Sequence, residues 1–210
     1  MYKHIAIEGN IGSGKTTLAT MLSEVFSVPC ILENFEKNPF LVKYYDDFEK
    51  YALHVELFFL TIRLKQLNHF FSETDLQGKT FFSDFIFEKT KIFAHTHLKD
   101  ESLQLFEAIF SELDEKYFLP DLVLYLHRPV FELKSNIEKR GRAMENDIPN
   151  AYLKNLELSY RRAFENENRF PVIWLNCSDI YFQPNDIIFG KIKDLLNQKW
   201  ENGLNEFNLI

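Results

Sequence analysis

This 210-residue sequence lacks long apolar runs, an excess of positive charge and a cluster of cysteines. No run approaches the roughly 20 apolar residues of a membrane helix, and the first residues enter a predicted strand, so we expect a cytoplasmic protein without signal peptide or membrane partner. A net charge of −7 argues against nucleic acid as the main partner. Its two cysteines, Cys30 and Cys177, cannot form a metal site alone and are expected as buried, reduced thiols.

Apolar segments that predict strands alternate with segments of helical periodicity. The predicted strands cover 3–8, 30–34, 80–84, 121–127 and 171–176, and the predicted helices cover 15–26, 49–72, 86–97, 101–118, 130–140, 150–167 and 185–200. This alternation predicts an α/β fold in which helices flank a five-stranded parallel sheet, within a single domain over 1–210. Ligands in such folds collect at the carboxyl ends of the strands.

Residues 9–16 carry the pattern G-x-x-x-x-G-K-[ST] between a predicted strand and a predicted helix, which is typical of a phosphate-binding P-loop. The glycines allow a tight loop whose N–H groups point inward, and the helix N-terminus adds positive charge. Lys15 can reach the β- and γ-phosphates, and the Thr16 hydroxyl can bind Mg²⁺. The predicted ATP-binding residues are Gly9, Asn10, Ile11, Gly12, Ser13, Gly14, Lys15, Thr16 and Thr17.

The helix predicted over 49–72 is apolar on almost every side, yet it contains Glu56 and Arg63. Seven residues separate these two charges, so they lie on one side of the helix, two turns apart. One interpretation is a pair of charges satisfied in the core or exposed at a flank. The other is a pocket wall for an aromatic ring with polar edges.

A lid is predicted over about 138–149, where a helix ends in basic residues and Gly141 breaks it. Arg140 and Arg142 in a glycine-hinged loop could close over phosphates and stabilise the transferring phosphoryl group. The alternative is a solvated helix end whose cations complement the helix dipole.

The P-loop alone fits a kinase, an ATPase motor or a GTP switch. No Asn-Lys-x-Asp base reader of a GTPase is present, and a motor would need a longer chain or a partner. Glu33 follows the second predicted strand, which we expect beside the P-loop strand, and it could accept the proton of an attacking hydroxyl. On position alone, an ordinary surface Glu is the alternative.

From residue 4 to about 176 the sequence resembles the deoxynucleoside kinases, and more closely their bacterial deoxyadenosine/deoxyguanosine kinase-like branch. The P-loop of that family typically reads Gly-Asn-Ile-Gly-[Ser/Ala]-Gly-Lys-[Ser/Thr], as residues 9–16 do. Its lid, Arg-Gly-Arg-x-x-Glu followed by Ile-Pro, matches 140–145 and 148–149. The resemblance implies that Glu33 is the general base.

The resemblance also implies an acceptor site. The family's Tyr that contacts the sugar 3′-hydroxyl falls on Tyr45, and its base-reading Gln, eleven residues later, falls on Glu56. Its Arg, seven residues further, falls on Arg63. The Glu of the lid, which also contacts the 3′-hydroxyl, is Glu145.

Two departures from the family pattern concern the acceptor. Glu56 is only an acceptor when ionised, whereas an amide also donates, so it suits guanine N1–H and the 2-amino group, or the amino group of adenine or cytosine. The family's [Asp/Glu]-Arg-[Ser/Thr] is replaced by Asp84-Phe85-Ile86. Asp84 keeps the metal role, but Phe85 supplies no charge, and we hypothesise that Lys89 replaces it in part.

The resulting prediction is a deoxynucleoside kinase that uses ATP and Mg²⁺, the latter held by Thr16 and Asp84, to phosphorylate the 5′-hydroxyl of a purine deoxynucleoside. The resemblance and the apolar helix 49–72 also predict a homodimer. One alternative is a nucleoside monophosphate kinase of the thymidylate kinase type. It would need a basic residue for the acceptor's phosphate, where Tyr and Glu are predicted here. Another is a nucleotide-binding regulator that has lost turnover, as Phe85 suggests.

Overall fold

A parallel β-sheet forms the centre of the protein, whose computed structural model describes residues 2–74, 76, 78–113, 119–145, 147–184 and 186–209. The strands stand in the order β2-β3-β1-β4-β5-β6, and each neighbouring pair is parallel. They are β1 (His4–Gly9), β2 (Cys30–Ile31), β3 (Phe81–Ser83), β4 (Leu122–His127), β5 (Pro171–Asn176) and β6 (Gly203–Asn208). β1, β4 and β5 are buried over almost their whole length, as expected where helices cover both faces.

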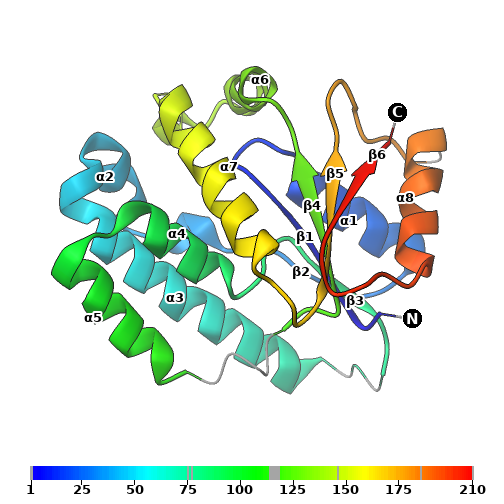
Figure 1. Ribbon diagram of the computed structural model, residues 1–210, viewed down its shortest axis with the longest axis horizontal. Coiled ribbons are helices and arrows are strands. Elements are labelled where there is room, and N and C mark those ends of the chain that lie inside the picture. Colours follow the sequence, from blue (N-terminus) through cyan, green and yellow to red (C-terminus); the bar gives the residue numbers. More distant parts are fainter. Residues whose placement is uncertain are drawn as a thin grey trace.

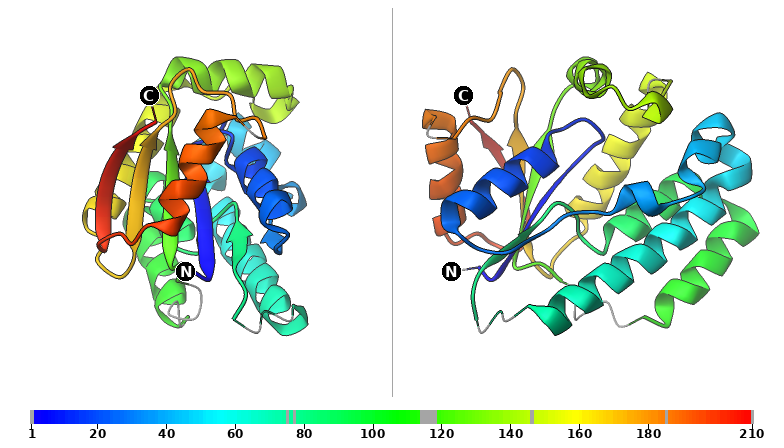
Figure 2. Two further views of the ribbon diagram at one scale, coloured as in Figure 1. Left: turned by 90° about the vertical axis from the view of Figure 1, so that its right-hand side faces the viewer. Right: turned by 180° about the vertical axis from the view of Figure 1, so that it is seen from behind.

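Helices cover both faces of this sheet (Figures 1 and 2). They are α1 (Lys15–Phe26), α2 (Leu41–Asp46), α3 (Phe48–Glu73), α4 (Lys89–His97), α5 (Asp100–Ser111), α6 (Val130–Arg140), α7 (Asn150–Glu165) and α8 (Ile187–Asn197). On one face α1 and α8 share an apolar core with the sheet, and on the other α7 and α4 do so. A further aromatic core joins α2, α3, α4 and α5 beside β2. In Figure 1, α6 lies above the carboxyl ends of the strands.

The five predicted strands and their parallel arrangement are confirmed, but the sheet has a sixth strand that the sequence pattern does not indicate. β6 is an edge strand whose side chains are half-buried or exposed, so it carries no apolar run. The prediction that β2 lies beside the P-loop strand is wrong, because β3 pairs with both β1 and β2. The short helix α2 is also not predicted from the sequence. The helix expected over 101–118 ends at Ser111, and 114–118 lie outside the described residues.

Arg128, directly after β4, holds the loop between β1 and α1 in place. Its guanidinium donates to the carbonyl oxygens of Ser13 (2.9 Å), Cys177 (2.7 Å) and Ile180 (2.5 Å), and to Glu132 Oε2 (2.9 Å). One planar cation thus ties the P-loop to the segment after β5. Because the Arg128 side chain is buried, the Ser13 and Ile180 carbonyls would lose their donor without it, whereas the Cys177 carbonyl would keep the Ile180 N–H.

Replacing this cation should loosen the P-loop. We expect Arg128→Met to lower the free energy of unfolding by about 3 kcal/mol or more, because two buried carbonyls lose their donor and the Cys177 carbonyl and Glu132 each lose one hydrogen bond. Chemical denaturation measures it. The matched control is Arg161→Met, which breaks the exposed ion pairs with Glu165 and Glu206 and should cost no more than about 1 kcal/mol. Equal losses in both variants would contradict the anchoring role.

His4, the first residue of β1, is a buried imidazole within the sheet. Its ring stacks on Phe81 with centroids 4.5 Å apart, and its Nε2 lies 2.8 Å from Ser83 Oγ. Burial lowers the pKa of His4 from 6.5 to about 4, against the smaller raising effects of a hydrogen bond to the Leu119 backbone and of the Asp121 charge. The folded protein therefore keeps this ring neutral where the unfolded chain binds a proton.

This shift predicts a loss of stability in mild acid. Below pH 6.5 the unfolded chain takes up a proton that folded His4 binds only near pH 4, so unfolding becomes easier as pH falls through that window. The contribution lost between pH 7 and pH 5 should be about 2 kcal/mol. Urea denaturation of wild type and His4→Gln at both pH values measures it. Identical pH dependence in the two proteins would contradict the prediction.

Candidate active site

The residues predicted for the site meet in one cavity of about 710 Å³ at the carboxyl ends of the strands. Those that line it are Gly9, Ile11, Gly12, Ser13, Gly14, Lys15, Thr16, Thr17, Glu33, Tyr45, Glu56, Arg63, Asp84, Arg140, Arg142 and Glu145. Among the predicted residues, only Asn10 does not line it. Its amide donates to the Leu153 carbonyl (2.7 Å) and accepts from Ile11 N (2.8 Å), so its side chain shapes the loop from behind.

The P-loop adopts a conformation that two glycines make possible. Gly12 has φ +82°, and a Cβ there would stand 2.7 Å from the Leu133 carbonyl of α6, so a side chain would push the lid helix away. Gly14 has φ +91° and forms the N-cap of α1. Asn136 of α6 also donates to the Gly12 carbonyl at 2.9 Å. The loop therefore packs directly under the helix that leads into the lid.

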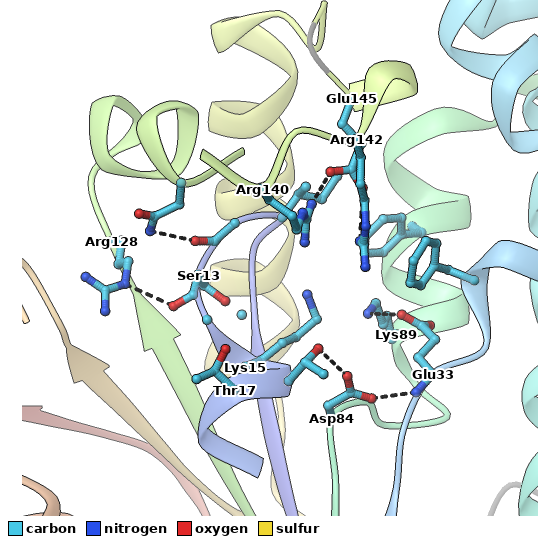
Figure 3. A pocket seen from close by; sticks show the side chains of 18 of the residues that line it. Ser13, Lys15, Thr17, Glu33, Asp84, Lys89, Arg128, Arg140, Arg142 and Glu145 are labelled. Carbon is cyan, nitrogen blue, oxygen red and sulfur yellow. Dashed lines mark hydrogen bonds and ion pairs between the residues drawn. The ribbon is translucent and has the colours of Figure 1, made fainter. Parts of the chain in front are cut away.

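Lys15 is half-buried at the start of α1 and points into the cavity (Figure 3). Burial and the neighbouring Lys89 lower its pKa to about 8, while Glu8, Glu33 and Asp84 oppose that shift. The charge on Lys15 is thus only partly compensated by the protein. An anionic ligand would complete its environment, as a phosphate group does in P-loop enzymes.

Asp84, directly after β3, connects the P-loop with the segment after β2. Its Oδ2 accepts from Thr16 Oγ1 at 2.5 Å, and its Oδ1 accepts from the backbone N–H of Glu33 at 2.6 Å (Figure 3). A hydroxyl and a carboxylate oxygen therefore stand together at the phosphate end of the cavity. Oxygen ligands of this kind are the ones that Mg²⁺ prefers.

Glu33 lies at the centre of a buried network of charged side chains. Arg63 contacts its Oε1 at 2.7 Å. Lys89 donates to its Oε2 at 2.8 Å (Figure 3). Burial raises the pKa of Glu33, but Lys89 and Arg63 outweigh it and bring the value to about 2. The same Lys89 Nζ lies 4.0 Å from Glu8 Oε1. Glu33 is therefore ionised throughout the neutral range.

Lys89 occupies the place of positive charge that the sequence leaves open. Phe85 is buried in the aromatic core with Phe59 and Phe87 and contributes nothing to the cavity. Lys89 instead lines the cavity, and the Glu33 and Glu8 charges raise its pKa against the effect of burial. The hypothesis that Lys89 replaces the lost cation in part agrees with this placement.

Glu56 and Arg63 are both buried in the cavity wall, but each has a separate partner. Arg63 donates to Glu33 and, at 2.8 Å, to Thr90 Oγ1. Glu56 Oε1 lies 2.8 Å from His97 Nδ1, at the end of α4. The expectation that the two helix charges line a pocket agrees with the structure, whereas His97 has no motif that would reveal it in the sequence.

Tyrosine rings fill the wall between these charges and the lid. Tyr45 lines the cavity, and burial raises its pKa, as does the Glu145 charge. Tyr44 and Tyr152 approach each other at 3.4 Å between their hydroxyls and also line it. Neither is predicted from the sequence, because aromatic residues on amphipathic helices look like ordinary core residues.

The predicted lid is a helix end, a glycine in the left-handed region and a short turn over the cavity. Gly141 ends α6 with φ +70°, and Ala143–Glu145 form a 3₁₀ turn, while residue 146 lies outside the described chain. Arg140 and Arg142 both pair with the buried carboxylate of Glu145 (Figure 3). The Arg142 guanidinium also lies 3.9 Å from the ring centroid of Phe35. Both arginines are thus held above Glu33.

Comparisons with known proteins agree with this geometry. The chain matches the family model described as deoxynucleoside kinase over residues 5–199. It is 38% identical over 161 residues to the deoxyguanosine kinase of Bacillus subtilis (strain 168), which covers 77% of this chain and 78% of that protein. It is 31% identical over 186 residues to the deoxyadenosine/deoxycytidine kinase of the same bacterium, and this match covers 83% of this chain and 82% of that protein.

The fold also matches a solved structure, that of deoxyadenosine kinase from M. mycoides with bound dATP. The TM-score is 0.75 at 23% identity, and the match covers 93% of this chain and 100% of that one. The resemblance that the P-loop and lid motifs indicate is therefore confirmed over almost the whole sequence: this chain belongs to the deoxynucleoside kinase family.

Proposed function

We propose that this protein transfers the γ-phosphoryl group of ATP to the 5′-hydroxyl of a purine deoxynucleoside, a reaction of nucleotide salvage. One observation carries the proposal: an ionised, buried Glu33 shares a cavity with the P-loop Lys15, with Asp84 and with two lid arginines. These are a base, a phosphate cradle and a charge clamp on the transferring group.

The donor half is built from the P-loop, and Thr16 with Asp84 fits Mg²⁺. Their oxygens are 2.5 Å apart, and among the described residues no cluster of three or more His, Cys, Asp or Glu could hold a metal by itself. That donor set suits an ion that keeps its waters and shares phosphate oxygens with the nucleotide. Mg²⁺ would neutralise charge on the β- and γ-phosphates. Lys15 and the loop N–H groups would bind the same phosphates.

In the reaction the 5′-oxygen forms a bond to the γ-phosphorus while the bond from that phosphorus to the β–γ bridging oxygen breaks. The proton of the 5′-hydroxyl passes to Glu33, and ADP leaves. Arg63 and Lys89 keep Glu33 ionised and fix its position, and each carboxylate oxygen still has a lone pair to accept with. Arg140 and Arg142 would stabilise the transferring group.

The acceptor half is lined by tyrosine and glutamate rather than by additional cations. Tyr45 and Glu145 would bind the sugar 3′-hydroxyl, and Glu56 with Arg63 would define the base end. The phosphate of a nucleotide acceptor would lie at the 5′ end, beside the ionised Glu33, where Arg63 and Lys89 are already paired with that carboxylate, so it would meet repulsion there. This favours a nucleoside over a nucleoside monophosphate as the substrate. Lys89 beside Glu33 supplies the positive charge that Phe85 lacks. This disfavours the alternative of a nucleotide-binding regulator that has lost catalytic turnover.

We further propose that residues 1–210 act as a single cytoplasmic domain and associate as a homodimer. None of the helices in the described chain is long and apolar enough to cross a membrane. Apolar side chains on the helical layer remain in contact with solvent, including Leu105 (49% exposed) and Ile109 (39%) on α5. A second copy covering such a face would remove them from water.

A substrate screen tests the function. With ATP and Mg²⁺, we expect the purified protein to phosphorylate a purine deoxynucleoside and none of the deoxynucleoside monophosphates. Glu33→Gln should reduce kcat about 100-fold or more with a smaller change in KM, because the amide cannot accept the proton. Product formation is followed by chromatography of labelled nucleoside.

Controls separate the competing interpretations. Calorimetric ATP binding by Glu33→Gln, unchanged from wild type, shows that the variant is folded. Phosphorylation of monophosphates only would establish the nucleotide kinase alternative. ATP binding without any turnover would establish the regulator, and near-full activity of Glu33→Gln would remove Glu33 as the base.

The sugar contact of Tyr45 has its own test. Tyr45→Phe should lower kcat/KM for a deoxynucleoside about ten-fold, because one hydrogen bond to the 3′-hydroxyl is lost. A 2′,3′-dideoxynucleoside lacks that hydroxyl, so its kcat/KM should be the same with either enzyme. An equal drop for both substrates would show that the variant acts through packing.

A further inference from the structure

Glu33 stands on a segment that has just left the sheet. β2 consists of Cys30 and Ile31, and the Asp84 N–H donates to the Ile31 carbonyl at 3.2 Å. Residues 32–34 follow this last bond between β2 and the chain after β3 and belong to no strand. The main chain that carries Glu33 is therefore held by side chains rather than by a neighbouring strand.

The amide of Gln66 on α3 takes over the role of a strand partner. Its Nε2 donates to the Leu32 carbonyl at 2.8 Å, and its Oε1 accepts from the Asn34 N–H at 3.1 Å. A peptide group in a parallel ladder makes the same two bonds, one to the residue before its partner and one to the residue after it. The two bonds of Gln66 therefore bracket Glu33, and we call them the Gln66 clamp.

Asp84 holds the same stretch at the residue between these two bonds. Its Oδ1 accepts from the Glu33 N–H at 2.6 Å (Figure 3). The three consecutive residues Leu32, Glu33 and Asn34 thus each have one main-chain group bound to a side chain. These bonds restrict the backbone dihedral angles on both sides of the Glu33 Cα.

Both ends of the Glu33 side chain are fixed from one helix. Arg63 and Gln66 lie three residues apart on α3, so they project from the same side of it. Arg63 contacts the Glu33 carboxylate at 2.7 Å, while Gln66 holds the main chain around the same residue. Because a cation fixes the carboxylate alone, the main-chain bonds are needed to fix the Cα from which that carboxylate extends.

Gln66 itself stays outside the cavity. Leu32 and Glu33 line the cavity, whereas Gln66 does not. Its side chain is half-buried and uncharged, so it neither contacts a bound substrate nor alters the charge of Glu33. Gln66 therefore affects the chemistry through the position of Glu33.

The position of a general base has to be accurate. The base works within about 2.6–3.2 Å of the group whose proton it takes. A displacement of about 1 Å in an active site can cost about 100-fold in rate. Loss of the Gln66 clamp leaves Asp84, Arg63 and Lys89 in place, so we expect a smaller displacement and a smaller loss.

We propose that Gln66 is a positioning residue for phosphoryl transfer: its amide holds the main chain on both sides of Glu33 and so sets the distance from the Glu33 carboxylate to the 5′-hydroxyl. This inference rests on the proposed function and adds to it a residue that acts on the base from outside the cavity.

Two variants of Gln66 test the clamp. Gln66→Met keeps the length and the helix propensity of the side chain without its amide, and kcat should fall about ten-fold. Calorimetric binding of ATP and of the deoxynucleoside should stay within about two-fold of wild type, because no ligand contact is lost. Gln66→Asn keeps the amide but is too short to reach both groups, so its kcat should fall equally. Wild-type kcat in these variants would overturn the proposal.

A matched control lies on the same helix. Asn68 is exposed two residues further along α3, and Asn68→Leu removes an amide at nearly equal size. Its kcat should equal that of wild type. A loss in Asn68→Leu as large as that in Gln66→Met would show a general weakening of α3 and would overturn the clamp. If Gln66→Met does not unfold cooperatively, Gln66→Asn decides.

Combination with Glu33→Gln separates positioning from a merely structural role. A glutamine at position 33 cannot accept the proton, so its exact position matters little. Gln66→Met should therefore lower the residual kcat of Glu33→Gln by less than about two-fold. A further ten-fold loss, equal to the loss in the wild-type background, would show that Gln66 acts independently of the base and would remove its positioning role.

Amide hydrogen exchange measures the clamp without turnover. In Gln66→Met the Asn34 N–H should exchange about ten-fold faster or more, while the Ile7 N–H in β1 keeps its wild-type rate. If wild type phosphorylates no nucleoside but the Asn34 exchange rate rises in this way, the proposed function is wrong and the clamp on Glu33 stands. If nucleosides are phosphorylated and Gln66→Met changes neither this exchange rate nor kcat, the clamp is wrong and the function stands.

Discussion

The rest of the site depends on the pairing of one buried carboxylate with two cations. Glu33 would be costly to bury alone, and Arg63 and Lys89 make its ionised form the stable one. Those cations come from α3 and α4, while Asp84 after β3 receives the Glu33 N–H. The charge pairing therefore draws the aromatic helical layer against the carboxyl edge of the sheet, and it sets the floor of the cavity.

Different interactions fix the phosphate end and the base end of the cavity. Around the P-loop, backbone groups and a planar guanidinium fix the geometry, and a lysine with partly uncompensated charge remains. At the base end, aromatic rings fix the geometry, and two buried polar atoms, Glu56 Oε2 and His97 Nε2, have no hydrogen-bond partner in the described part of the chain. Lys89 contacts both Glu8 near the end of β1 and Glu33. A substitution of Lys89 would therefore alter the charge balance at the phosphate end and at the base end of the cavity.

Local sequence motifs predict much of the fold and of the site. The parts that depend on contacts between distant residues could not be predicted from the sequence. The G-x-x-x-x-G-K-[ST] loop and the buried strands 121–127 and 171–176 depend on neighbours in sequence, so the P-loop and the central sheet follow from the pattern. Strand order does not, because β3 enters between β1 and β2 only in three dimensions. Arg128 could have been suspected from its place directly after a strand. His97 could not, since its partner lies 41 residues away on another helix.

The ion pairs within the lid change what it means for an anion to enter the site. Arg140 and Arg142 share one counter-ion, the carboxylate of Glu145, and the Arg142 guanidinium lies over the ring of Phe35. A ligand does not meet two bare cations; it exchanges with a carboxylate of the protein. A singly charged anion gains little from such an exchange, whereas a triphosphate brings several charges in place of one. Glu145 therefore competes with any incoming anion for the two lid arginines. Only an anion that carries more negative charge than this one carboxylate displaces it.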